Sequence, residues 1–130
     1  MVFVTNRIAG AKYNISDLNR VEANVQTLAD TLVGYGYTIS VDTYSTWLET
    51  MFFTDESNES RFIGNLQEFK DNFYLSTEVI PSTMKLLTWQ NANNIEKLLE
   101  KVYNNIINME KSFKKSGTFK SGQVIILWVL

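Results

Sequence analysis

The longest periodic stretch of the chain runs from Thr88 to Lys115. Its apolar residues recur at alternating spacings of four and three, which places them along one face of an α-helix. These residues are Ile95, Leu99, Val102, Ile106, Met109 and Phe113. At 1.5 Å per residue such a helix is about 40 Å long, so two further helices can pack against it. The pattern therefore predicts a long core helix over residues 89–115.

Two more stretches have the same period. The apolar positions are Leu18, Val21, Val25, Leu28 and Leu32 in one, and Phe62, Leu66, Phe69 and Phe73 in the other. Gly34 and Gly36 end the first stretch, and Pro81 disfavours helix in the connection before residue 89. The predicted helices are 15–33, 56–74 and 89–115. Three helices with one apolar face each bury those faces together, so the sequence predicts a mainly α fold, a three-helix bundle.

Short segments outside the helices have a different pattern. Residues 2–8 (VFVTNRI) alternate loosely between apolar and polar side chains, and residues 37–43 (YTISVDT) place apolar side chains at every second position. Residues 124–130 (VIILWVL) are β-branched, aromatic and uncharged. These compositions favour strands, so short β segments are predicted at the termini and near residues 37–43. Residues 45–53 fit a short helix or an extended segment.

Each predicted helix begins with a residue whose side chain can accept hydrogen bonds from the first-turn N–H groups. These residues are Asn14, Asp55 and Thr88, and three positions later come the short polar residues Asp17, Asn58 and Asn91. A polar residue at that position can bond back to the residue that starts the helix, as in a capping box. The three helices are therefore expected to start in the same way.

The three helical stretches also align along their whole length. With offsets of 41 and 74 residues, both the apolar positions and the starting residues coincide. The first offset also matches two polar pairs, Arg20 with Arg61 and Asn24 with Asn65, whereas the third stretch has other residues there, Asn94 and Leu98. Two explanations stay open. Any three amphipathic helices align on their apolar positions, and an internal relationship would in addition explain the polar agreement.

The size and charge of the chain narrow the class of protein. At 130 residues a single helical domain over residues 1–130 is expected. Twelve basic and fourteen acidic residues give a net charge of −2. Since nucleic-acid affinity depends largely on Lys and Arg at phosphates, no nucleic-acid partner is expected. The longest wholly apolar run has seven residues, and a membrane helix needs about twenty, so no membrane partner is expected either.

Candidate chemistry is sparse. The chain has no His and no Cys, and therefore lacks the commonest general base, the thiol nucleophile and the usual zinc ligands. No glycine-rich phosphate-binding motif occurs, since the six glycines are scattered. The sequence therefore predicts no enzyme, no cofactor and no metal site.

Two clusters of charged residues lie near the ends of the predicted helices. Asp55, Glu56 and Glu59 could approach a calcium ion, but they lack the glycine and the terminal glutamate of an EF-hand loop. The basic residues Lys111, Lys114, Lys115 and Lys120 could approach a phosphate. Acidic side chains are favoured at a helix start and basic ones at a helix end by the helix dipole, so both clusters are interpreted as helix-end residues.

The C-terminal apolar run is the candidate interface. An uncharged run of β-branched and aromatic residues aggregates if it is exposed, so it must pair within the domain or with another chain. The candidate interface residues are Phe119, Val124, Ile125, Ile126, Leu127, Trp128, Val129 and Leu130. Strand addition between two copies predicts a homodimer, and pairing with residues 2–4 of the same chain is the alternative.

Four stretches carry a resemblance to a known family. They are AGAKYNISDLNRVEANVQTLAD, RFIGNLQEF, IPSTMKLLTWQNANNIEKLL and SGTFKSG, in the same order over residues 7–122. The chain resembles an uncharacterised family of virion structural proteins of phages and prophages of Gram-positive bacteria, which are described as tail components. Residues 37–53 and the VIILWVL run lie outside the resemblance.

The resemblance implies a non-enzymatic phage or prophage structural protein, associated with the tail, that acts through contacts with other virion proteins. Its expected location is the virion, or the cytoplasm of the bacterial host before assembly. The alternative is a small intracellular binding or adaptor module encoded by a prophage. The resemblance implies no catalytic residue, cofactor or binding site.

Overall fold

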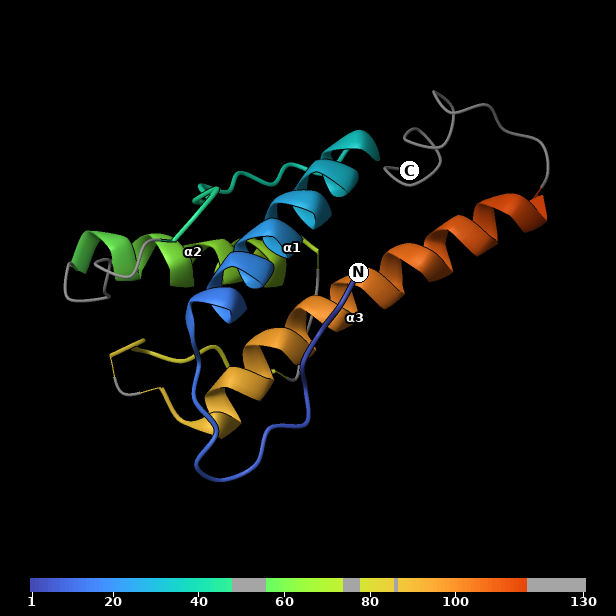
Figure 1. The fold of residues 1–130 in the computed structure, drawn as a ribbon. Helices are drawn as coiled ribbons and strands as arrows, with labels where there is room; N and C mark the ends of the chain where they lie inside the picture. Colours follow the sequence, from blue (N-terminus) through green and yellow to red (C-terminus); the bar gives the residue numbers. More distant parts are fainter. Residues whose placement is uncertain (48–55, 74–77, 86, 117–130) are drawn as a thin grey trace.

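The computed structural model of the chain describes residues 1–47, 56–73, 78–85 and 87–116. Its helices are α1 (Ile15–Gly34), α2 (Glu56–Asn72) and α3 (Trp89–Ser116), and all three contact one another. Figure 1 shows them packed as a bundle in which α3 is the longest member. The predicted mainly α fold with three helices is confirmed, with helix bounds within two residues of those expected from the apolar periodicity.

The first helix begins and ends as its sequence predicts. The side chain of Asn14 accepts from the N–H of Asp17 (3.1 Å), and the Asp17 carboxylate accepts from the N–H of Asn14 (2.9 Å). This is a complete capping box. After Tyr35, Gly36 adopts a φ of 95°, a conformation that side chains with a Cβ disfavour. The chain therefore leaves the helix where its glycines allow it to turn.

The start of α3 is also confirmed. The hydroxyl of Thr88 accepts from the N–H of Asn91 (3.1 Å), as an N-terminal cap does. Asp55, the predicted cap of α2, lies outside the described residues.

The apolar faces of the three helices form one core. The most deeply buried side chains come from all three helices, and their exposed fraction is below 1%. They are Leu99 and Val102 of α3, Val21 and Leu32 of α1, and Leu66 and Phe69 of α2. All the apolar residues that define the three periodic stretches belong to this core. Burial of such a side chain contributes about 1.5–3 kcal/mol, so these faces hold the bundle together.

No strand is formed in the described residues. Residues 2–8 and 37–43, predicted as short strands, are irregular segments that lie against the helices, and the run 124–130 lies outside the described residues. The physical reason is that main-chain groups of both segments bond to side chains of the helices instead of to a neighbouring strand. The apolar alternation in these segments reflects packing on helices.

Candidate functional site

The most informative site is a set of buried polar residues. In the described residues these are Arg7, Glu22, Asn24, Asn58, Asn65, Asn93 and Glu96. They fall into two groups, each of which holds an irregular segment against two helices. The first clamp holds residues 2–7 and consists of Asp17, Arg20 and Asn24 of α1 with Asn93 and Glu96 of α3. The second clamp holds residues 42–47 and consists of Asn58, Arg61 and Asn65 of α2 with Asn19 and Glu22 of α1.

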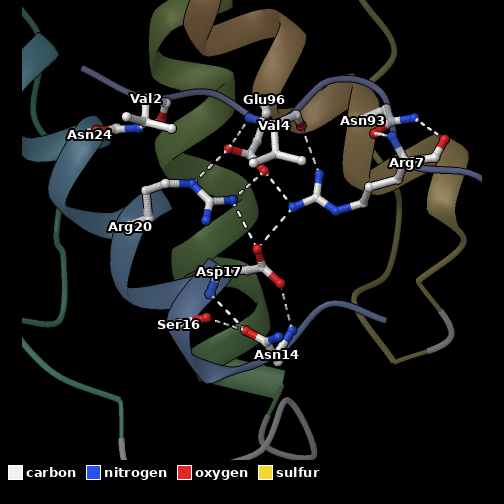
Figure 2. Close-up of polar contacts among 10 residues, drawn as sticks. All are labelled: Val2, Val4, Arg7, Asn14, Ser16, Asp17, Arg20, Asn24, Asn93 and Glu96. Carbon is white, nitrogen blue, oxygen red and sulfur yellow. Dashed lines mark hydrogen bonds and ion pairs between the residues drawn. The ribbon is translucent and has the colours of Figure 1, made fainter. Parts of the chain in front are cut away.

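Glu96 is the centre of the first clamp, and its side chain is completely buried. One carboxylate oxygen accepts from the N–H of Val4 (3.0 Å) and from Nε of Arg20 (3.2 Å). The other accepts from Nη2 of Arg7 (2.5 Å) and of Arg20 (2.7 Å). Figure 2 shows the two guanidinium groups on either side of this carboxylate. Four donors therefore compensate the cost of burying its charge.

Two asparagines of the first clamp bond the main chain of the segment. Asn24 donates to the carbonyl oxygen of Val2 (2.9 Å). Asn93 accepts from the N–H of Arg7 (2.9 Å) and donates to the carbonyl oxygen of the same residue (3.0 Å). A side-chain amide thus replaces a neighbouring strand as the partner of the backbone.

Asp17 supplies the second negative charge of the first clamp. Its carboxylate accepts from Nη2 of Arg7 (3.1 Å) and of Arg20 (2.9 Å), in addition to the N–H of Asn14. Burial alone would raise the pKa of Asp17, but the hydrogen bond from Asn14 and the two guanidinium groups bring the pKa below its ordinary value. The carboxyl is held ionised by the groups that it joins.

Tyr13 lies beside the first clamp without entering its hydrogen bonds. The guanidinium carbon of Arg7 is 5.0 Å from the centroid of the Tyr13 ring, a cation–π distance. The Tyr13 hydroxyl is buried and has no hydrogen-bond partner in the described part of the chain. Burial, and after it the charge of Glu96, raises the pKa of Tyr13 far above its ordinary value.

Glu22 is the centre of the second clamp and is 1% exposed. Its carboxylate accepts from Nη1 and Nη2 of Arg61 (3.0 and 2.9 Å), which form a two-point ion pair. It also accepts from the N–H of Tyr44 (3.3 Å) and from the indole nitrogen of Trp47 (2.8 Å). As in the first clamp, two donors come from a helix arginine and two from the held segment.

Two asparagines again bond the main chain of the segment. Asn65 accepts from the N–H of Asp42 (3.0 Å) and donates to its carbonyl oxygen (2.7 Å). Asn19 accepts from the N–H of Trp47 (2.6 Å). The side chain of Trp47 is buried in the core, as expected for this residue type.

The two clamps are copies of one arrangement, matched residue by residue. The matched pairs are Val2 and Asp42, Val4 and Tyr44, and Arg7 and Trp47 in the segments; Asp17 and Asn58, Arg20 and Arg61, and Asn24 and Asn65 in the helix with the arginine; and Asn93 and Asn19, and Glu96 and Glu22 in the helix with the glutamate. The glutamates and arginines make the same kind of contact in both clamps, while the asparagine that bonds both main-chain groups of one residue is Asn93 in the first clamp and Asn65 in the second. The polar agreement in the sequence therefore reflects an internal structural relationship.

The helix α1 takes part in both clamps, with Arg20 and Asn24 in one and Asn19 and Glu22 in the other. By contrast α2 contributes only the arginine side of a clamp and α3 only the glutamate side. The remaining pair of helices is α2 and α3. At the positions that match the glutamate side of a clamp α2 has Ser60 and Ile63, and at those that match the arginine side α3 has Asn94 and Leu98. No such clamp can form there.

The segment 78–85 is held by other groups. Glu59 of α2 accepts from the hydroxyl of Thr83 (3.0 Å) and from the N–H of Met84 (3.1 Å), and Lys101 of α3 forms an ion pair with Glu78 (2.8 Å). Of the three acidic residues considered for calcium, Glu59 thus bonds the chain's own connection. No group of three or more acidic residues in the described parts of the chain is arranged to hold a metal ion.

A shallow groove lies near the end of α3. Its volume is about 400 Å³, and it is lined by Tyr37, Asn72, Phe73, Asn105, Asn108, Met109 and Ser112. The rings of Tyr37 and Phe73 meet edge to face, with centroids 5.0 Å apart, and the Tyr37 hydroxyl is 3.8 Å from the sulfur of Met109. The lining has no carboxylate or amine, so it offers packing and amide contacts rather than acid–base chemistry.

The candidate interface predicted from the sequence, Phe119 and residues 124–130, lies outside the described residues. Neither clamp was predicted from the sequence. One part of the signal was noted, because Arg20 and Asn24 of the first clamp match Arg61 and Asn65 of the second at the first offset. The signal that completes it is the pair Asn19 and Glu22, which recurs as Asn93 and Glu96 at the second offset.

None of the helices in the described ranges is long and apolar enough to cross a membrane. Comparisons of the chain with protein-family models, with curated proteins and with solved structures give no match. The clamps fix the main chain of residues 2–7 and 42–47 on the helices, and they pair the buried carboxylates with guanidinium groups. Their arrangement positions segments on helices.

Proposed function

We propose that this chain is a non-enzymatic structural protein of a phage or prophage particle, associated with the tail, that acts through contacts with other virion proteins. It would be found in the virion, and in the bacterial cytoplasm before assembly. The resemblance of residues 7–122 to virion structural proteins is one support for this proposal.

The observation that carries the proposal is how the buried carboxylates are used. Glu22 and Glu96 each accept four hydrogen bonds from the chain itself, and both face a guanidinium group. A general acid or base must exchange a proton with a substrate that it can reach. Carboxylates saturated in this way stabilise the fold, which is what a protein that works through its surface requires.

The test is incorporation into particles. Prophage is induced in the host, particles are purified on a density gradient, and peptides of this chain are quantified across the fractions by mass spectrometry. We expect the chain to follow a known tail protein in constant ratio, and an abundant cytoplasmic protein serves as the control. If the chain stays with the cytoplasmic control, the virion proposal is wrong and the adaptor module is favoured.

We further propose that the candidate interface, Phe119 and residues 124–130, joins copies of the chain or other virion proteins by strand addition. A chain truncated after Gln123 is compared with the full chain by light scattering. A smaller, still folded species after truncation is the expected result. If both chains are monomers and the truncated one is unstable, these residues belong to the domain's own core.

A further inference from the structure

The first clamp recognises features that a second copy of the chain also carries. Its helix residues bond the carbonyl oxygen of Val2, the N–H of Val4 and both main-chain groups of Arg7. The aromatic ring of Phe3 packs on Tyr103 of α3, with centroids 5.7 Å apart. None of these contacts depends on which copy of the chain supplies the segment.

Charge complementarity favours the same occupant. Without the segment, the first clamp holds Asp17, Arg20 and Glu96, which together carry one net negative charge. Arg7 brings the positive charge that balances it, through bonds to both carboxylates. A buried charge left without its partner is costly, so the clamp selects a segment with a cation at this position.

The connection between the segment and α1 can act as a hinge. Residues 8–12 are all exposed, and a main-chain hydrogen bond within them joins the N–H of Ala11 to the carbonyl oxygen of Ile8 (3.0 Å). Gly10 has a φ of 89°, so the turn depends on a residue without a side chain. Figure 1 shows this connection as a loop beyond the ends of α1 and α3. The connection itself is held by few contacts.

Exposed apolar side chains lie in the segment and in its hinge. In the described residues the exposed large apolar side chains are Met1, Val2, Ile8, Val33 and Val79; Met1 and Val2 belong to the segment and Ile8 to the hinge that follows it. Val2 and Ile8 are 64% and 75% exposed. Exposed apolar groups that gather on one segment mark a surface that another chain covers.

We propose that residues 1–7 exchange between two copies of this chain, so that the segment of each copy occupies the first clamp of the other. Such an exchange replaces each intramolecular contact by the identical contact between copies. This inference concerns a segment other than the C-terminal interface and does not depend on the chain being a virion protein.

The absence of cysteine allows a direct test with full-length chains. One chain carries Phe3→Cys and a second carries Tyr103→Cys. The two are mixed, incubated and treated with a short thiol-specific crosslinker. Exchange predicts a covalent heterodimer several-fold more abundant than that from a control mixture of Phe3→Cys with Thr27→Cys, whose cysteine is on an exposed position of α1. Thermal melts check that all three chains are folded.

A second measurement needs no substitution in the clamp. Deletion of residues 9–11 shortens the hinge so that the segment cannot reach its own clamp, and a glycine–serine insertion after Gly10 lengthens it. We expect light scattering to show the deletion variant shifted toward dimers and the insertion variant toward monomers. The C-terminal residues are the same in both, so a difference reports on the hinge alone. If hinge length has no effect and the cysteine mixture matches its control, the exchange does not occur.

Discussion

The two clamps solve the same problem with different charges. The first joins Arg7 and Arg20 to Asp17 and Glu96, two cations and two anions. The second joins one cation, Arg61, to one anion, Glu22. Both arrangements are neutral as a whole. Besides the arginine, the glutamate and the two asparagines at matched positions, the two copies therefore share the neutrality of the buried set.

The difference in charge is confined to two matched positions. Where the first segment donates with a charged side chain, Arg7, the second donates with a neutral one, the indole of Trp47. Where the first clamp has Asp17 three residues before its arginine, the second has Asn58, whose oxygen accepts from Arg61 (3.2 and 3.0 Å). In both clamps the residue three positions before the helix arginine accepts a hydrogen bond from it. The first clamp has one more positive and one more negative charge than the second.

The largest expected effect comes from the central glutamates. Glu96→Gln removes the charge opposite two guanidinium groups and places an amide donor against other donors. It should lower the free energy of unfolding by about 3–5 kcal/mol. Glu22→Gln should cost less, since a single guanidinium loses its partner. Urea unfolding of both variants measures the difference, and equal losses would mean that the number of cations does not set the cost.

Next in size are the asparagines on the glutamate side. Asn93→Ala removes the partner of two main-chain groups of Arg7, whereas Asn19→Ala removes the acceptor of one, the N–H of Trp47. Each unsatisfied buried group costs about 1–3 kcal/mol, so the first variant should be the less stable one. Hydrogen exchange of the Arg7 and Trp47 amides, measured in the parent chain and in each variant, shows whether the loss is local to its own clamp.

The features that the sequence predicts are those encoded by residues close together in the chain. The helices and the caps at Asn14 and Thr88 were predicted, because periodicity and capping are written in neighbouring residues. The arginine side of the clamps was visible as well, since Arg20 and Asn24 recur at one offset. The glutamate side recurs at the other offset, from Asn19 and Glu22 to α3, so no single alignment contains a whole clamp.

The held segments could not be found from sequence. VFVTNR and DTYSTW share little, because most of their contacts use main-chain groups that every residue has. The strand predictions for residues 2–8 and 37–43 failed for the same reason. Alternating apolar residues show that a segment lies on an apolar surface, but they do not say whether its main chain bonds to a strand or to helix side chains.

A smaller effect tests the neutrality of the first clamp. Arg7→Gln alone leaves it with one net negative charge and Asp17→Asn alone with one positive charge, while the double variant is neutral again. The double variant should therefore lose less stability than the sum of the single losses, by about 0.5–3 kcal/mol. Additive losses, measured by denaturant unfolding at neutral pH, would contradict the charge rule.

Replacing Asp17 should also change how the free energy of unfolding depends on pH. Because the pKa of Asp17 is lowered in the folded chain, its carboxylate contributes stability above the ordinary pKa of 3.8. That contribution is lost as the pH falls through the folded-state pKa. Acid unfolding of Asp17→Asn should accordingly depend less on pH than that of the parent chain. Asn58→Ala is the control, since the matched position in the second clamp carries no titrating group.

The smallest expected effect is at Tyr13, whose ring lies beside the first clamp. Its hydroxyl is buried without a partner, so Tyr13→Phe should leave stability at neutral pH unchanged or raise it by at most about 1 kcal/mol. Since burial raises the pKa of Tyr13, its neutral form is favoured in the folded chain, and the parent chain should lose stability as the pH rises above about 10. Tyr13→Phe should lose less stability over that range.

Unfolding at neutral and alkaline pH measures this difference, and Tyr44→Phe serves as the matched variant, since the Tyr44 ring also stacks on an arginine. An equal alkaline loss in the parent chain and in Tyr13→Phe would show that the Tyr13 hydroxyl is reached by solvent, and that the first clamp is open on the side that faces its hinge.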